Sequence, residues 1–145
     1  MRRVAVAIVL GFALSGCSTT MTSPNEATSI NPERVLKYGS KTSEADAHIV
    51  VTRDSGAIGS GCLTGFFING SLVAKFDVRE SANFYLPSGQ YIFGYGFVKG
   101  RGLCAVDRSS TIRERETVLA AGETKRFRLF IDQDSNTDIL PVSQK

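Results

Sequence analysis

The sequence predicts an all-β protein, folded as a single antiparallel β-sandwich of about seven strands, with a small barrel as the alternative. Across residues 47–132, apolar and polar residues alternate in short runs, which is the period of a strand with one buried face. Turn-forming residues separate these runs at regular intervals. The same stretch has no amphipathic helical pattern, so strands are expected to supply the core.

The predicted strands are defined by the turns between them. Asn69-Gly70 stands between two apolar runs and predicts a tight hairpin, because both central residues of a type I′ turn need positive φ. Pro87-Ser88-Gly89 and residues 120–123 mark two further turns. In chain order, the predicted strands are residues 48–53, 62–68, 72–78, 82–86, 90–98, 112–119 and 124–131.

Polar segments flank the 47–132 domain. Residues 17–46 are rich in Ser, Thr, Asn and Glu and predict a tether that, if flexible, spans on the order of 30 Å. One short helix is expected within it, capped by Asn31 and ended by Gly39. A helix this short should either dock Val35 and Leu36 on the domain or fray. Residues 133–145 are expected to form a flexible tail.

The first residues predict export. Arg2 and Arg3 precede an apolar stretch, residues 4–14, that is too short to cross about 30 Å of hydrocarbon, which takes roughly 20 residues. A positive region followed by such a stretch is typical of a signal peptide, here residues 1–16.

The motif behind that stretch, Leu14-Ser15-Gly16-Cys17, resembles the lipobox of bacterial lipoproteins. The resemblance implies cleavage before Cys17 and lipidation of this cysteine, so that membrane lipid anchors the chain. In such lipoproteins an Asp after the cysteine favours the inner membrane, so Ser18 implies an outer-membrane anchor facing the periplasm. An ordinary signal peptide with an incidental cysteine is the alternative.

The composition gives no reason to expect a nucleic-acid partner. Loss of residues 1–16 lowers the formal net charge from +3 to +1, because Arg2 and Arg3 are the only charged residues removed. A nearly neutral net charge does not call for nucleic acid, and the periplasm expected for an exported chain argues against it.

With Cys17 lipidated, Cys62 and Cys104 are the remaining cysteines, and an oxidising periplasm favours a disulfide between them. Two buried thiols or a metal pair are the alternatives. His48 is the only histidine, and no closely spaced cysteine pair exists, so neither a metal nor a cofactor is expected.

One predicted strand carries a row of four aromatic rings, Tyr91, Phe93, Tyr95 and Phe97. Such a row either faces the core or forms a platform on which sugars stack, and the core is the simpler expectation. The glycines between the rings leave the opposite face bare, so another backbone or a ligand could approach it closely.

Four arginines lie on the last two predicted strands: Arg113, Arg115, Arg126 and Arg128. If these strands pair, one register sets Arg115 opposite Arg128, which requires an anion or acid nearby. A shift by one residue brings glutamates beside the arginines and gives a neutral solvated face.

No catalytic residue is assigned, and the protein is not expected to be an enzyme. A Ser-His-Asp triad would have to use His48, and no spacing singles out partners for it. The glycine-rich segment at residues 56–61 lacks the Lys-Ser/Thr of a phosphate-binding loop.

Three turn motifs resemble those of PEGA-like sandwich domains found in bacterial lipoproteins. The motifs are Gly65-Phe66-Phe67-Ile68-Asn69-Gly70, Leu86-Pro87-Ser88-Gly89-Gln90-Tyr91 and Ala121-Gly122-Glu123-Thr124. The resemblance covers most of residues 47–131. It implies an immunoglobulin/transthyretin-like sandwich and no particular chemistry.

A second resemblance is carried by Ser88-Gly89-Gln90-Tyr91 with Lys99-Gly100. This is similar to the motif of membrane-bound C-type lysozyme inhibitors, which plug the cleft of the enzyme, although the tryptophans usual between its two parts are absent. The resemblance implies that Ser88 and Lys99 lie exposed on one loop edge.

The expected function is that of a lipid-anchored, non-enzymatic binding or accessory module in the periplasm. Its partner would be an envelope protein or a cell-wall glycan. The alternatives are an inhibitor of lysozyme or another muralytic enzyme, and a glycan-binding lipoprotein. The candidate contact residues are Ser88, Tyr91, Tyr95, Lys99, Arg126 and Arg128.

Overall fold

The computed structural model describes residues 19–105 and 111–143. The predicted signal peptide and the predicted lipidation site, Cys17, lie outside these described residues. The described elements, in chain order, are β1 (Thr28–Ser29), η1 (Pro32–Arg34), β2 (Ala47–Arg53), β3 (Thr64–Ile68), β4 (Ser71–Phe76), β5 (Glu80–Leu86), β6 (Gly89–Phe97), η2 (Gly102–Cys104), β7 (Arg113–Leu119), β8 (Thr124–Ile131) and β9 (Thr137–Val142), where η is a single 3-10 turn.

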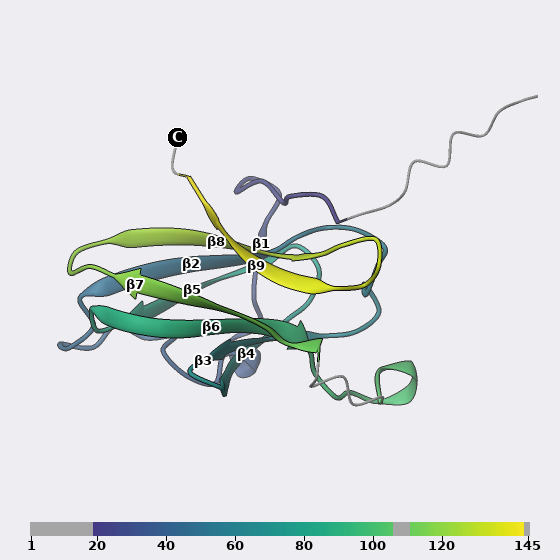
Figure 1. Ribbon diagram of the computed structural model, residues 1–145, viewed down its shortest axis with the longest axis horizontal. Helices are drawn as coiled ribbons and strands as arrows, with labels where there is room; N and C mark the ends of the chain where they lie inside the picture. The colour runs from purple at the N-terminus through teal and green to yellow at the C-terminus, as the bar shows by residue number, and fades with distance from the viewer. Residues whose placement is uncertain (1–18, 106–110, 144–145) are drawn as a thin grey trace, which may run out of the picture.

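The strands form two sheets that face each other (Figure 1). One sheet has the order β1-β5-β2-β8-β9 and the other the order β4-β3-β6-β7. The all-β prediction is confirmed, and each of the seven predicted strands is present with its ends shifted by two residues or fewer. Most strand pairs are antiparallel, as predicted, but β1 pairs with β5 and β2 with β8 in parallel.

The predicted hairpin is confirmed between β3 and β4. Asn69 and Gly70 have φ values of 48° and 73°, the positive values that a type I′ turn requires. The Asn69 side chain also accepts a hydrogen bond from the backbone N–H of Ile92 in β6, at 2.9 Å. The turn is thereby tied to the neighbouring strand.

Alternate residues of both sheets supply the core. Phe66 of β3 packs on Phe84 of β5 with ring centroids 5.3 Å apart, and Phe93 of β6 packs edge-on against Phe127 of β8 at 5.2 Å. All four rings are buried. Because each pair joins one sheet to the other, these edge-on and tilted contacts hold the two layers together.

The aromatic row of β6 faces this core. Phe93 and Tyr95 are fully buried and Phe97 nearly so, while Tyr91 at the start of the strand is half-buried. A row of rings buried in this way cannot serve as a platform for sugars. That use of β6 is excluded.

The other side of β6 is also filled. A Cβ atom placed on Gly96 would lie 2.8 Å from a side-chain carbon of Ile112, and one on Gly94 would lie 3.2 Å from Phe67 and from Ile112. The glycines therefore admit side chains of the protein itself, and the expectation of a bare face open to a ligand is wrong.

Residues 137–142, expected within a flexible tail, form strand β9. This strand pairs antiparallel with β8 along its whole length. Ile139 is only 1% exposed, and the Thr137 hydroxyl lies 3.0 Å from the carbonyl oxygen of Tyr95. Pro141 is accommodated because β9 is an edge strand, where a missing N–H costs no ladder bond.

Residues 19–46, expected to form a tether, lie along the domain. β1 extends one sheet, and the predicted helix is reduced to the single turn η1, with Asn31 as its cap. Val35 packs against the core, as expected, while Leu36 remains 52% exposed. Backbone pairing to the sheet replaces helical pairing here, because so short a helix gains little by itself.

Cys62 and Cys104 form the predicted disulfide, with Cα atoms 5.6 Å apart. The bond joins the loop before β3 to η2 after β6 across 42 positions of sequence. In the chain-entropy model, a closed loop of this length stabilises a fold by roughly 4 kcal/mol.

Candidate functional site

Ser88 and Lys99 do not form one surface. Ser88 lies in the turn before β6, where its backbone N–H and its hydroxyl donate to the carboxylate of Asp46. Lys99 follows the other end of β6. At about 3.4 Å per residue of strand, the two residues lie on the order of 35 Å apart. The shared loop edge implied by the lysozyme-inhibitor resemblance is absent.

Of the two candidate tyrosines of β6, one is buried and the other is held against a turn. Tyr95 is fully buried. Tyr91 is half-buried, and its hydroxyl donates to the carbonyl oxygen of Pro87 at 2.8 Å. Desolvation by burial, followed by the nearby Tyr38 and Asp46, raises the pKa of Tyr91 above its ordinary value. Tyr91 thus braces the β5–β6 turn.

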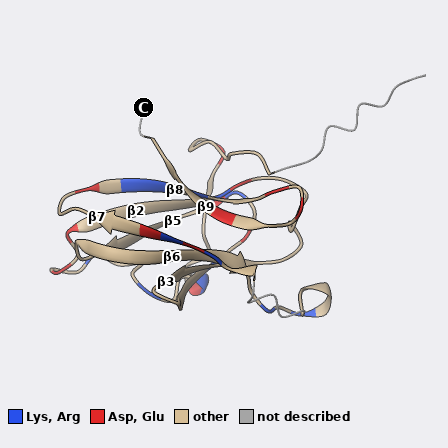
Figure 2. Ribbon diagram, viewed as in Figure 1, with Lys and Arg blue, Asp and Glu red and all other residues tan. Residues whose placement is uncertain are grey.

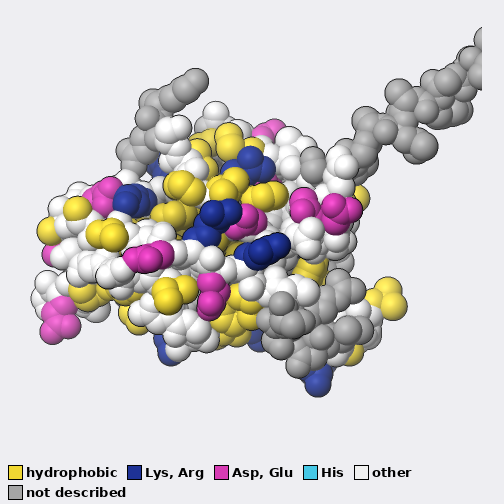
Figure 3. Space-filling view, in the orientation of Figure 1, with side chains coloured by type: hydrophobic (Ala, Val, Ile, Leu, Met, Phe, Trp, Pro, Cys, Tyr) yellow, Lys and Arg dark blue, Asp and Glu magenta, His cyan; other side chains and the backbone are white. Residues whose placement is uncertain are grey.

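The arginines are divided between the two sheets. β7 pairs with β6 and β8 pairs with β2 and β9, so neither of the two registers considered from the sequence exists. Arg115 of β7 forms an ion pair with Asp138 of β9, 2.5 Å between nitrogen and oxygen. Figure 2 shows basic and acidic residues next to each other along β7, and Figure 3 shows such neighbours on the molecular face in view. This face is charge-balanced.

Arg128 and Arg126 project from β8 on the side away from the core. Arg128 forms an ion pair with Asp54, and its guanidinium lies 5.3 Å from the ring centroid of Phe130. Burial raises the pKa of the Asp54 carboxyl, and the hydrogen bond from Arg128 opposes that rise. Arg126 is exposed and has no ion-pair partner among the described residues.

Polar and aromatic side chains share this outward face with Arg126. Alternation along the strands brings His48 of β2 beside Asn83 and Tyr85 of β5. The rings of His48 and Tyr85 are stacked, with centroids 5.0 Å apart and planes 13° apart. His48 Nε2 lies 2.9 Å from the side-chain oxygen of Asn83. Each of these three side chains is therefore held in position by another.

A groove of about 810 Å³ runs between β5 and the segment that precedes β2. Tyr85 and Asn83 line one wall, and Tyr38, with 41% of its surface exposed, lines the other. Tyr38 has a φ of 61°, and its carbonyl oxygen accepts a hydrogen bond from the Tyr85 N–H at 2.9 Å. The left-handed turn at Tyr38 thus fixes one tyrosine beside the other.

A second groove, of about 240 Å³, continues from the first. Both are lined by Ser29, Ser81 and Asn83, and the second also by Arg126 and Arg128. We call the two together the outer-face groove. It runs from a pair of tyrosines, past hydroxyl and amide groups, to an arginine without an acidic partner.

The sequence did not point to the tyrosine end of the outer-face groove. Tyr38 lies in the segment interpreted as a tether, and Asn83 and Tyr85 occupy ordinary outward positions of a predicted strand. The alternation of apolar and polar residues predicts that Asn83 and Tyr85 point away from the core. Tyr38 lies close to these two residues because residues 29–44 run along the edge of β5. No local sequence pattern predicts this course of the chain.

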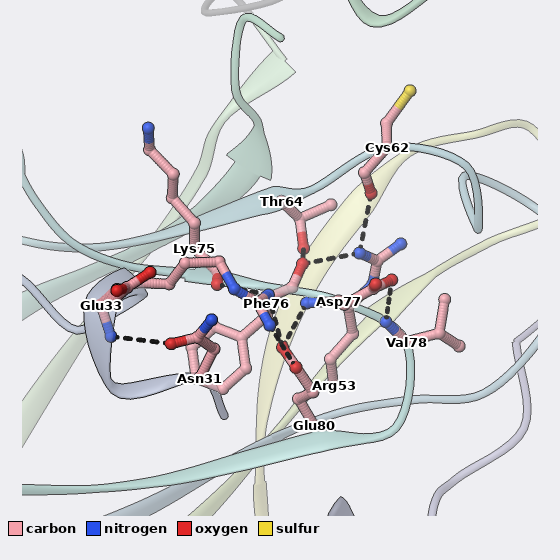
Figure 4. A network of polar contacts seen from close by, with 11 residues as sticks. Asn31, Glu33, Arg53, Cys62, Thr64, Lys75, Phe76, Asp77, Val78 and Glu80 are labelled. Carbon is pink, nitrogen blue, oxygen red and sulfur yellow. Dashed lines mark hydrogen bonds and ion pairs between the residues drawn. The ribbon is translucent and has the colours of Figure 1, made fainter. Parts of the chain in front are cut away.

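A second polar cluster lies inside the domain and is structural. Arg53 is 2% exposed, and its guanidinium donates to the carbonyl oxygens of Gly59, Cys62 and Phe76 at 2.7–2.9 Å. Figure 4 shows Arg53 reaching Cys62 and Phe76 from β2. The side chain ties the loop before β3 to the end of β4.

Neighbouring contacts in Figure 4 hold the N-terminal segment. Arg34 of η1 donates to the carboxylate of Glu80 and to the carbonyl oxygen of Lys75, the latter at 3.2 Å. Glu80 also accepts the backbone N–H of Asp77 at 2.7 Å. These contacts fix η1 against β4 and β5 and therefore support the wall of the outer-face groove.

The side-chain partners of His48 are Asn83 and Thr124, rather than the serine and carboxylate that a hydrolase triad would need. Within the described ranges, no three His, Cys, Asp or Glu side chains gather as a metal site would require, and no helix is long and apolar enough to cross a membrane. The chain matches no known family model and no curated protein sequence.

Proposed function

We propose that this protein is a lipid-anchored, non-enzymatic binding module of the bacterial envelope, and that its outer-face groove takes an anionic glycan. The anchor is the lipid on Cys17, as the lipobox resemblance implies, with the domain in the periplasm at the outer membrane. We also propose that the two packed sheets form an immunoglobulin/transthyretin-like sandwich, as the PEGA-like turn motifs imply.

The observation that carries the choice of ligand is the order of side chains along the outer-face groove. Tyrosine rings such as Tyr38 and Tyr85 offer flat faces that pack on the apolar faces of sugar rings. The amide of Asn83 and the hydroxyl groups of Ser29 and Ser81 suit sugar hydroxyl groups. Arg126, without an acidic partner among the described residues, suits a carboxylate or phosphate.

The shape of the groove supports an extended ligand over a compact one. The two parts of the groove share three residues and continue one into the other across β5, β2 and β8. The stacked rings of His48 and Tyr85 are already ordered, so little side-chain entropy is lost on binding. A polymer chain laid along the sheet would contact both ends at once.

Co-sedimentation with purified, protein-free murein sacculi tests the proposal. We expect the lipidated protein in detergent to sediment with sacculi. The substitution Tyr38→Ala should raise the apparent Kd about tenfold, a loss of about 1.4 kcal/mol. Arg126→Gln should raise it about fivefold at low salt and less at high salt, because salt screens an exposed charge pair.

Matched controls lie away from the outer-face groove. Ile92→Ala removes an exposed apolar side chain from the other sheet, and Arg113→Gln removes one exposed positive charge from the same sheet. Both should bind sacculi like the parent. The proposal fails if the parent does not sediment, or if the control variants lose as much binding as the groove variants. Retention by an envelope protein with no sacculus binding would favour the accessory role instead.

A further inference from the structure

The first described residues are fixed to one end of the domain. The Thr19 N–H donates to the carbonyl oxygen of Ile131 at 3.2 Å, and the Ile131 N–H donates to the Thr19 hydroxyl at 3.0 Å. Thr20 and Ser55 exchange two backbone hydrogen bonds, of 2.7 and 3.0 Å. Together these bonds hold Thr19 at the end of β8.

This attachment determines how far the domain stands from the membrane. Only Ser18 separates Thr19 from Cys17. Consecutive Cα atoms are about 3.8 Å apart, so the Cα of Cys17 lies within about 7.6 Å of the Cα of Thr19. If Cys17 is lipidated, as the proposed function requires, this end of the domain lies at the bilayer surface. A long flexible spacer between the lipid and the domain is then excluded.

The same end carries an exposed apolar side chain. Leu103, in η2, is 97% exposed, the largest exposed fraction of the large apolar side chains in the described part of the chain. Leu103 lines a small cavity together with Gly59 and Ser135, and Gly59 lies against Ile131, the partner of Thr19. Figure 1 shows residues 99–105 and the turn between β8 and β9 at one end of the two sheets.

The loop that presents Leu103 is braced. Its base is closed by a hydrogen bond from the Gly100 N–H to the carbonyl oxygen of Cys104, at 2.8 Å, and Cys104 is joined to Cys62 by the disulfide. Because Leu103 is 97% exposed, its side chain buries little of its surface within the described fold. A single exposed leucine is common on protein surfaces, but this one lies at the end of the domain that Thr19 holds next to Cys17.

We propose that residues 99–104 form a membrane-contact loop that inserts Leu103 into the headgroup boundary of the bilayer. Lys99 and Arg101 precede the leucine and are exposed, so their charges can remain among lipid phosphates. Asp132 and Asp134 lie in the turn after β8 at the same end, so attraction by charge alone does not explain binding. The lipid on Cys17 holds the loop at high effective concentration, and one leucine then suffices to orient the domain.

The chain contains no tryptophan, so a single introduced tryptophan reports the position of this loop. The full chain with the substitution Leu103→Trp would be lipidated in cells. The purified protein would then be reconstituted into phosphatidylethanolamine/phosphatidylglycerol vesicles that contain brominated lipid. The matched probe is Ala121→Trp, in the exposed turn at the opposite end of β8. We expect brominated lipid to quench the tryptophan at position 103 at least threefold more than the one at position 121.

Tryptophan itself has an affinity for membrane interfaces, so hydrogen exchange is measured on the tryptophan-free protein as a control. In vesicles, the backbone amides of residues 99–105 should exchange more slowly in the parent protein than in the Leu103→Ser variant. Acylation of Cys17 is verified by mass spectrometry. If Cys17 is acylated but the two tryptophans are quenched equally, or the parent and the Leu103→Ser variant exchange equally, the membrane-contact loop is overturned and the proposed anchor is not. Absence of acyl groups from Cys17 overturns both.

Discussion

Arg53 shows how one residue can act as a core component despite its charge. Its guanidinium is buried and satisfies three backbone carbonyl groups, two from the loop before β3 and one from the end of β4. Nothing in the local sequence distinguishes this arginine from the exposed ones, because its carbonyl partners are brought together only by the tertiary fold. From the sequence, Arg53 is simply the last residue of a predicted strand.

Replacing Arg53 with methionine should strongly destabilise the domain. Methionine fills similar space but leaves the carbonyl oxygens of Gly59, Cys62 and Phe76 buried without this donor, so we expect the free energy of unfolding to fall by about 3 kcal/mol. Urea unfolding followed by circular dichroism measures the change. Arg79→Met, at an exposed position, should change it by less than about 0.5 kcal/mol. Similar effects of the two substitutions would contradict the role assigned to Arg53.

At the scale of the elements, the alternation of apolar and polar residues predicted the strands and which of their faces are buried. The period of two located seven strands and their buried faces, and Asn69-Gly70 located the hairpin. The sequence does not predict strand β9, because this segment contains Pro141 and contributes a single large buried side chain, Ile139. A weak segment of this kind becomes a strand only because β8 offers it a partner.

Two adjacent residues of β9 test whether this strand belongs to the folded domain. Ile139 points into the core and Leu140 points outward and is half-buried. Ile139→Ala should lower the free energy of unfolding by about 2–4 kcal/mol, because it removes fully buried methyl groups and leaves a cavity. Leu140→Ala should cost less than half as much. If both substitutions leave urea unfolding unchanged, residues 137–142 behave as a loose tail and the strand assignment is wrong.

At the scale of the whole molecule, strand order and the candidate site were beyond reach of the sequence. The parallel pairing of β2 with β8 joins segments separated by most of the domain, and no turn motif encodes it. The outer-face groove depends on that pairing, because it brings Arg126 of β8 beside Asn83 of β5 across β2. Of the residues selected from the sequence, Arg126 and Arg128 line this groove, whereas Tyr95 is buried.

The proposed anchor, glycan groove and membrane-contact loop give the molecule a single orientation. The end that holds Thr19 and Leu103 would face the bilayer, and the outer-face groove would lie on the side of the domain. An elongated glycan parallel to the membrane could then contact the groove without passing between the domain and the lipid. This arrangement depends above all on the modification of Cys17.

Intact-mass and peptide mass spectrometry of the protein isolated from membranes of an expressing bacterium would establish whether that modification exists. We expect a mature chain that begins at Cys17 and carries a diacylglyceryl group and an amide-linked acyl chain, and we expect Cys17→Ala to release the chain from the membrane fraction. A chain that retains residues 1–16, or that is cut elsewhere and carries no acyl group, would contradict the proposed anchor and the orientation inferred from it.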